Sequence, residues 1–131
     1  AAIVLEKLEI FNEELKKRNT AAAYYTDNIT SDLLVQFTPE DYHSSWAQYS
    51  LVAQSNSERF KIMSRLGEAN IPSMIYYKLP LHMQQVFKKL GYSEGDFPFS
   101  ESISKRIFSI PMHPYLERKQ QDKIIEVLNN G

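Results

Sequence analysis

An apolar stripe of helical period runs through the first 29 residues and constrains the fold more than any other feature of this chain. Its members follow steps of three and four residues, apart from a polar gap at Arg18, and they are Val4, Leu8, Phe11, Leu15, Ala22, Tyr25 and Ile29. This spacing predicts one amphipathic helix of roughly 25 residues. A helix of that length in so small a domain usually packs against a second body. The Phe, Ala and Tyr in the stripe favour a neighbouring domain over a coiled-coil dimer.

The rest of the sequence predicts a small sheet flanked by helices. Strands are expected at 33–37, 46–53 and 71–77, and helices at about 55–69, 83–90 and 117–128, with one more helix after a loop at 93–102 that carries Ile103, Ile107 and Phe108. In the second strand, Ala47, Tyr49, Leu51 and Ala53 alternate onto one face. Gly91 is expected to end the short helix at 83–90. We therefore expect an α+β fold with a long N-terminal helix and about three strands, as a single domain over residues 1–131.

Composition excludes several classes of function. The formal charge of −1 argues against a nucleic-acid footprint or a polybasic membrane patch. The chain has no cysteine, which rules out disulfides, thiolate metal sites and a cysteine nucleophile, and which is compatible with the cytoplasm. No secretory leader is recognisable. The chain begins Ala-Ala-Ile-Val-Leu, already in helical pattern, and we expect it to be part of a longer polypeptide.

No complete catalytic constellation can be assembled from these residues. The spacings between His43, His82 and His113 match no local metal-ligand motif, so no metal site is predicted. The sequence contains no nucleophile elbow around a serine and no glycine-rich phosphate loop. The paired carboxylates Glu13 and Glu14 fall on the solvated face of the first helix, where burial cannot tune their pKa values.

The segment IYYKLPLHMQQ, residues 75–85, is the best candidate for ligand contact. Alternation along a strand predicts that one of Tyr76 and Tyr77 points toward the core and the other toward the surface or a cleft. Pro80 stiffens the exit of the strand, and His82 follows at the start of the next helix. Ligand contacts concentrate in loops at strand ends. A strand-to-helix turn without any ligand explains the same residues and stays open at this point.

Five segments together resemble one family, the DegT/DnrJ/EryC1/StrS sugar aminotransferases. They are AAIVLEKLEIFNEELKKRN, SSWAQYSL, IPSMIYYKLPLHMQQVFKKLGY, GDFPFSE and SIPMHPYL, in the order and spacing of that family's C-terminal part. The resemblance covers essentially the whole chain. It implies the C-terminal small domain of a fold type I enzyme that uses pyridoxal 5′-phosphate (PLP), with the N-terminal PLP-binding domain outside this chain.

The resemblance also implies a reaction. Such an enzyme moves an amino group, usually from glutamate, to a keto group on a nucleotide-linked sugar, and serves cell-surface polysaccharide biosynthesis. The catalytic lysine and the cofactor-binding residues are expected upstream of Ala1, so the fragment alone is expected to be inactive and to bind no cofactor. The SSWAQY variant looks most like enzymes that act on UDP-2-acetamido-2-deoxy-3-oxo-glucuronate. A cytoplasmic homodimer is expected.

By the same resemblance, Tyr76, Tyr77 and His82 are the expected substrate-binding residues. The sequence departs from the family at Lys78, where proline is usual. This change puts the stiffness of the strand exit in doubt and places a positive charge where a diphosphate or a sugar carboxylate would lie. A solvated lysine explains the residue equally well. The alternative for the whole chain is a non-enzymatic module that associates through its long amphipathic helix.

Overall fold

The N-terminal helix predicted from the apolar stripe is present but is divided in two. In the computed structural model, which describes residues 2–130, helix α1 spans Ala2–Glu9 and helix α2 spans Phe11–Asn28. The break is at Ile10, whose φ of −100° and ψ of 0° depart from helical values. Neither glycine nor proline is present there, so the break could not be predicted from the local sequence.

The sheet has two strands where about three were predicted. Strand β1 (Tyr49–Val52) pairs antiparallel with β2 (Ile107–Ile110), and Tyr49 lies opposite Ile110. Two of the expected strands are each reduced to one bridge at an outer edge of this pair. Leu34 bridges Val52, and Met74 bridges Ser109. The mixed helix and strand content confirms the α+β class, but the predicted strands at 33–37 and 71–77 are wrong.

The second strand of the pair was missed. The sequence placed Ile107 and Phe108 on a helix, whereas helix α4 spans only Pro98–Ser104 and the chain then enters β2. Its backbone pairs with β1 on one side and, at Ser109, with Met74 on the other, and Phe108 is buried in the core. Pro111 comes directly after the strand and stops the ladder from continuing.

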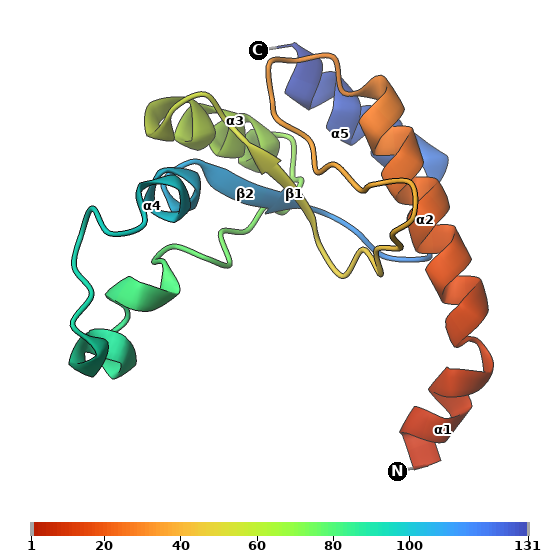
Figure 1. The fold of residues 1–131 in the computed structure, drawn as a ribbon. Helices are drawn as coiled ribbons and strands as arrows, with labels where there is room; N and C mark the ends of the chain where they lie inside the picture. The colour runs from red at the N-terminus through yellow and green to blue at the C-terminus, as the bar shows by residue number, and fades with distance from the viewer. Residues whose placement is uncertain (1, 131) are drawn as a thin grey trace.

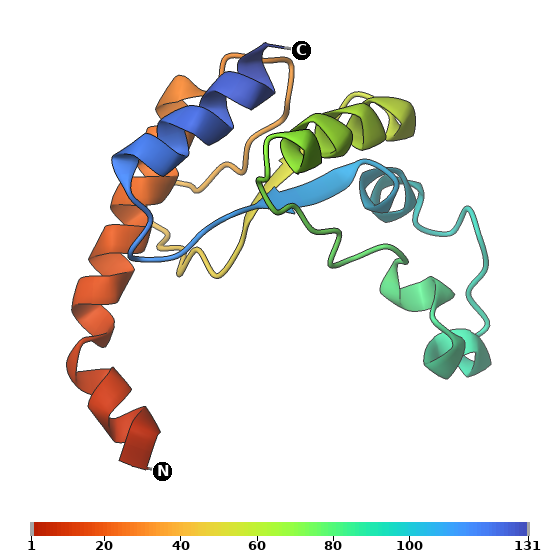
Figure 2. The ribbon, with the colours of Figure 1, turned by 180° about the vertical axis from the view of Figure 1, so that it is seen from behind.

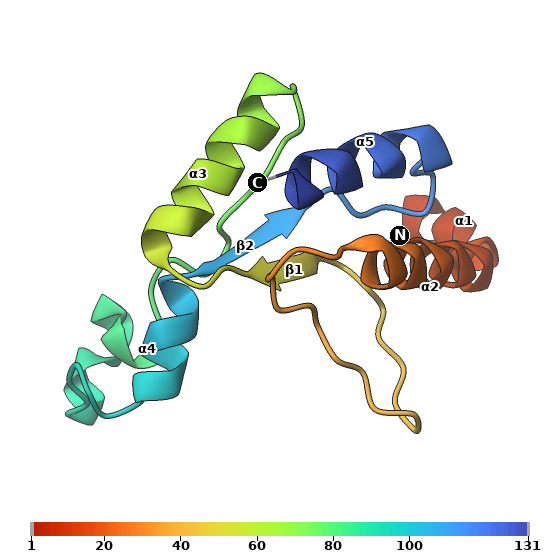
Figure 3. The same cartoon turned by 90° about the horizontal axis from the view of Figure 1, so that it is seen from above.

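Helices pack on one face of this ribbon to form the core. Helix α3 spans Asn56–Glu68 and is capped by Ser55, whose side chain accepts a hydrogen bond from the Glu58 amide. Helix α5 spans Arg118–Asn129, close to the predicted range, and lies between α2 and α3 (Figure 3). The largest fully buried side chains that these elements enclose are Tyr25, Tyr49, Leu51, Leu66, Phe108 and Leu128.

We call β1, β2, α2, α3 and α5 together the body. Two parts of the chain extend from it. One is α1, none of whose residues is buried. The other is the side lobe, defined as residues 75–104, which holds two 3₁₀ turns, Leu81–Met83 and Gln85–Leu90, and helix α4. Gly91 ends the second turn with φ of 83°, as expected for a left-handed cap. α1 and the lobe lie on opposite sides of the body in Figures 1 and 2.

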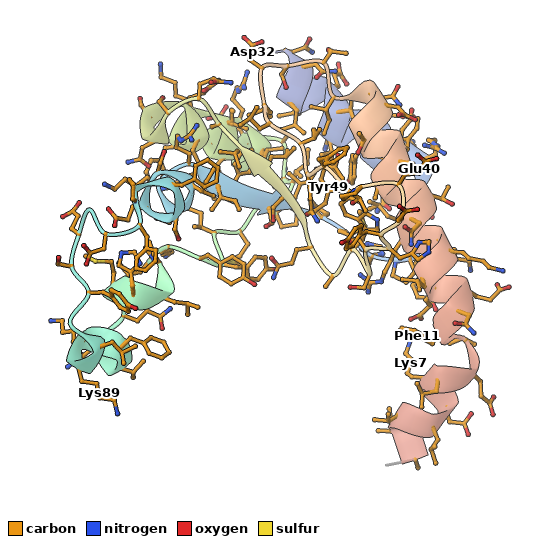
Figure 4. The ribbon with its side chains drawn as sticks, viewed as in Figure 1. Lys7, Phe11, Asp32, Glu40, Tyr49 and Lys89 are labelled. Atoms are coloured by element: carbon orange, nitrogen blue, oxygen red, sulfur yellow. The ribbon has the colours of Figure 1, made fainter. Side chains whose placement is uncertain are left out.

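Figure 4 shows the same separation with side chains. The labelled Lys7 marks one extension, Phe11 marks the start of α2 next to it, Lys89 marks the tip of the other extension, and Tyr49 lies in the centre of the body. Within residues 2–130, no helix combines the length and the apolarity needed to cross a bilayer.

Candidate functional site

The two tyrosines of the candidate segment lie side by side on the surface. The rings of Tyr76 and Tyr77 are 6.5 Å apart between centroids, and the residues are 55% and 62% exposed. The prediction that one of them points toward the core is wrong, because the chain leaves the sheet after the single bridge at Met74 and no longer alternates between two faces. Both hydroxyl groups are therefore available to a ligand.

His82 lies in a different environment from the two tyrosines. Its side chain is 7% exposed, and its ring contacts that of Phe97 at 4.8 Å. The Nε2 atom lies 3.0 Å from Oε1 of Glu101, which is also buried. The structure thus brings Tyr76 and Tyr77 together, but places His82 inside the side lobe with only a small part of its ring accessible.

Glu101 joins three segments of the side lobe. Its carboxylate accepts hydrogen bonds from the backbone N–H of Gly95, at 2.9 Å, and of Phe97, at 3.3 Å, in addition to its contact with His82. Burial acts to raise the pKa of Glu101, but the two N–H groups and the imidazole outweigh it and leave the pKa below its ordinary value. Because an ionised carboxylate can only accept hydrogen bonds, Nε2 of His82 carries the proton in this pair.

The lowered pKa of Glu101 predicts an acid-sensitive side lobe. A carboxyl group whose pKa is lower in the folded state than in the unfolded state stabilises the fold at pH values above its unfolded pKa, about 4.3. That stabilisation is lost as the pH falls through the folded-state pKa. We expect hydrogen-exchange protection of the Gly95 and Phe97 amides to fall in that acid range. In Glu101→Gln, protection at neutral pH should already be lower and should vary less with pH.

The matched control is Glu94→Gln, since Glu94 is 70% exposed in its side chain and pairs with Lys105 only at the surface. Equal effects of the two substitutions would contradict this assignment.

A cavity of about 190 Å³ opens beside Tyr76. It is lined by residues 47–48, by residues 72–74 together with Tyr76, and by residues 109–112, so three segments distant in sequence form it. The backbone conformation of Trp46 sets the direction in which the chain continues into residues 47–48. Trp46 has φ of 47°, a left-handed value that is rare for a bulky residue, and it ends the extended conformation that was predicted to begin there.

Four contacts hold Trp46 in this conformation. Its ring stacks on Tyr49 with 5.5 Å between centroids, and its Nε1 donates to Oδ1 of Asn19. Its carbonyl oxygen accepts from Nη1 of Arg18, and its backbone N–H donates to Oγ of Ser44. These contacts fix where Ala47 and Gln48 enter the cavity.

Gln48 and Glu101 were not among the site residues predicted from the sequence. Gln48 lies in the SSWAQY segment and Glu101 in the GDFPFSE segment, so the motifs were visible, but their roles depend on contacts far apart in sequence. No three His, Asp or Glu side chains gather as potential metal ligands in the part of the chain that the structure describes.

Comparison with known proteins gives one consistent result. The DegT/DnrJ/EryC1/StrS aminotransferase family matches residues 1–129. The chain is 37% identical to a pleiotropic regulatory protein of Geobacillus stearothermophilus, covering 96% of this chain and 34% of that protein. It is 31% identical to a UDP-2-acetamido-2-deoxy-3-oxo-D-glucuronate aminotransferase of Pseudomonas aeruginosa, covering 99% and 35%.

A solved structure agrees with these relatives. The crystal structure of a DegT DnrJ EryC1 StrS aminotransferase from Brucella abortus superposes with a TM-score of 0.88 at 40% identity, over 98% of this chain and 34% of that one. This chain therefore spans about a third of the length of the proteins that it matches.

Proposed function

We propose, because this chain belongs to the DegT/DnrJ/EryC1/StrS aminotransferase family, that it is the C-terminal small domain of a PLP-dependent enzyme that transfers an amino group to a nucleotide-linked ketosugar. The single observation that carries the proposal is the family match over residues 1–129. The short coverage of the relatives supports the proposed division into domains, with the PLP-binding domain outside this chain. Glutamate is the proposed amino donor.

The residues described here do not fit the cofactor. PLP enzymes hold the cofactor through a lysine, and every lysine within residues 2–130 is exposed. The cavity beside Tyr76 is lined by no basic residue that would neutralise a phosphate. We therefore assign the cofactor to polypeptide outside this chain and assign to this chain only contacts with the substrate.

Tyr76, Tyr77 and His82 are the proposed contacts with the sugar nucleotide. The two tyrosines offer exposed hydroxyl groups, and His82 offers the small accessible part of a ring whose other nitrogen is held by Glu101. Lys78 is exposed beside them and is placed to meet a phosphate or a carboxylate of the same ligand. The proposed product enters cell-surface polysaccharide biosynthesis, and the proposed substrate is a UDP-linked 2-acetamido-3-oxo-glucuronate, as named for the Pseudomonas relative.

The full-length protein is proposed to act as a cytoplasmic homodimer. The absence of cysteine is compatible with a reducing compartment. Large apolar side chains stand exposed on α1, among them Ile3, Leu5 and Leu8, and such surfaces need a covering partner.

The visible absorbance of protein-bound PLP tests this proposal first. We expect full-length protein to become coloured with PLP and to transfer an amino group from glutamate to at least one member of a panel of nucleotide ketosugars. Protein that stays colourless after incubation with PLP would refute the proposal and would favour an interaction module that binds through its amphipathic helix.

A further inference from the structure

The cavity beside Tyr76 differs from the rest of the side-lobe surface in its chemistry. Among its lining residues there is neither a cation nor an anion. Its polar groups include the side-chain amide of Gln48 and the hydroxyl groups of Ser73 and Tyr76, and its apolar groups include Met74 and Met112. Such a mixture fits a ligand with both hydroxyl groups and an apolar C–H surface.

Gln48 is one of the polar side chains of this cavity that the protein itself leaves available, together with the exposed hydroxyl group of Tyr76 and the hydroxyl group of Ser73. Within residues 2–130, its amide group makes no hydrogen bond to another protein group, although the residue is half-buried. Ser109, by contrast, lies 2.9 Å from Oγ of Ser50 and is already paired. A half-buried amide without a protein partner is placed to bond a ligand, and its position is fixed by the strained backbone of the preceding Trp46.

The size and the charge of the cavity restrict what can occupy it. Sites for whole drug-sized ligands usually measure about 300–1,000 Å³. At about 190 Å³ the cavity suits one ring of a nucleotide sugar and not the whole molecule. A diphosphate or a carboxylate would be desolvated there without a compensating cation, which is unfavourable. The uncharged face of the sugar is the part that fits.

We propose that this cavity receives the uncharged pyranose ring of the substrate, and that the Gln48 side chain hydrogen-bonds the ring and helps to determine sugar specificity. The assignment rests on the proposed function and adds a residue and a subsite to it. It also separates two roles on this surface. The neutral ring lies against Gln48 and Tyr76, and the charged parts of the ligand lie outside the cavity, on the side of Lys78.

Calorimetric binding to the full-length protein tests the subsite without requiring turnover. The probes are UDP-N-acetylglucosamine with free UDP, and dTDP-glucose with free dTDP. In Gln48→Ala, the affinity for the nucleotide sugar should fall about three- to tenfold, as expected for one lost hydrogen bond, while the affinity for the free nucleotide should stay within about twofold. The matched control is Gln36→Ala, since Gln36 is exposed and lies outside this cavity.

A charge substitution separates a neutral ligand group from an anionic one. Gln48→Arg should weaken binding of the nucleotide sugar, because it fills the cavity and adds an unmatched charge. Tighter binding in Gln48→Arg would show that the cavity holds an anion and would overturn the assignment. Equal losses for sugar nucleotide and free nucleotide in Gln48→Ala would also overturn it, as would the absence of binding to both probe pairs. Failure of the proposed function itself is read separately, from the absence of cofactor colour.

Discussion

Replacing Tyr49 by alanine should lower the free energy of unfolding by about 3–5 kcal/mol, the largest effect on stability that we expect from one substitution in this chain. Tyr49 is completely buried in the centre of the body. Its ring contacts those of Tyr25, at 5.0 Å, and Trp46, at 5.5 Å, so truncation removes two aromatic contacts and leaves a cavity between α2 and β1. The measurement is equilibrium unfolding of the 131-residue chain in urea.

The conservative variant Tyr49→Phe separates the ring from the hydroxyl group. It keeps the aromatic contacts and loses only the hydrogen bond of 2.8 Å between the hydroxyl group and Oγ1 of Thr26, which should cost about 1 kcal/mol. A Tyr49→Ala variant no less stable than Tyr49→Phe would show that the ring does not organise the core as described.

The second large effect concerns the reaction with the sugar. In the full-length protein, if it is the proposed aminotransferase, replacing both Tyr76 and Tyr77 by alanine should lower kcat/KM for the ketosugar by about 10- to 100-fold, because two exposed groups proposed to bind the substrate are removed. The half-reaction with glutamate should change by less than about twofold. The measurement is rapid-mixing absorbance of the cofactor, first with glutamate and then with the ketosugar.

His82→Ala belongs in the same experiment but needs a stability measurement beside it. Because His82 is buried against Phe97 and pairs with Glu101, its removal also disturbs the side lobe. A loss confined to the sugar step, with unchanged thermal unfolding, would support contact with the substrate. Equal losses in both half-reactions would instead show that His82, or the pair of tyrosines, supports folding.

Local patterns predicted the helices more accurately than the sheet. The end of the short helix at Gly91 and the shared buried face of Tyr49, Leu51 and Ala53 depend on short-range chemistry and are confirmed. Strand β2 and the two single bridges depend on which segments meet across the fold. The apolar residues around Ile107 fit a helix or a strand equally well until β1 is present to pair with them.

The candidate site shows the same division. Two aromatic residues at the end of an apolar run indicated the position of the surface that Tyr76 and Tyr77 form. The burial of His82 could not be predicted, because its partner Glu101 is 19 residues away and reaches it only through the folding of the side lobe. Nor could the sequence indicate that Gln48 shares a cavity with Tyr76, since that cavity is closed by residues around Ser109.

Helix α1 has a consequence for how this sequence can change during evolution. None of its residues is buried by the rest of the chain, and Ile10 separates it from α2. Substitutions at Val4 or Leu8 therefore leave the packing of the body unaltered, and selection on them is expected to act through the partner surface proposed to cover α1. Among homologous sequences, residues 2–9 should covary with positions outside this domain, and residues such as Ala22 and Tyr25 with positions inside it.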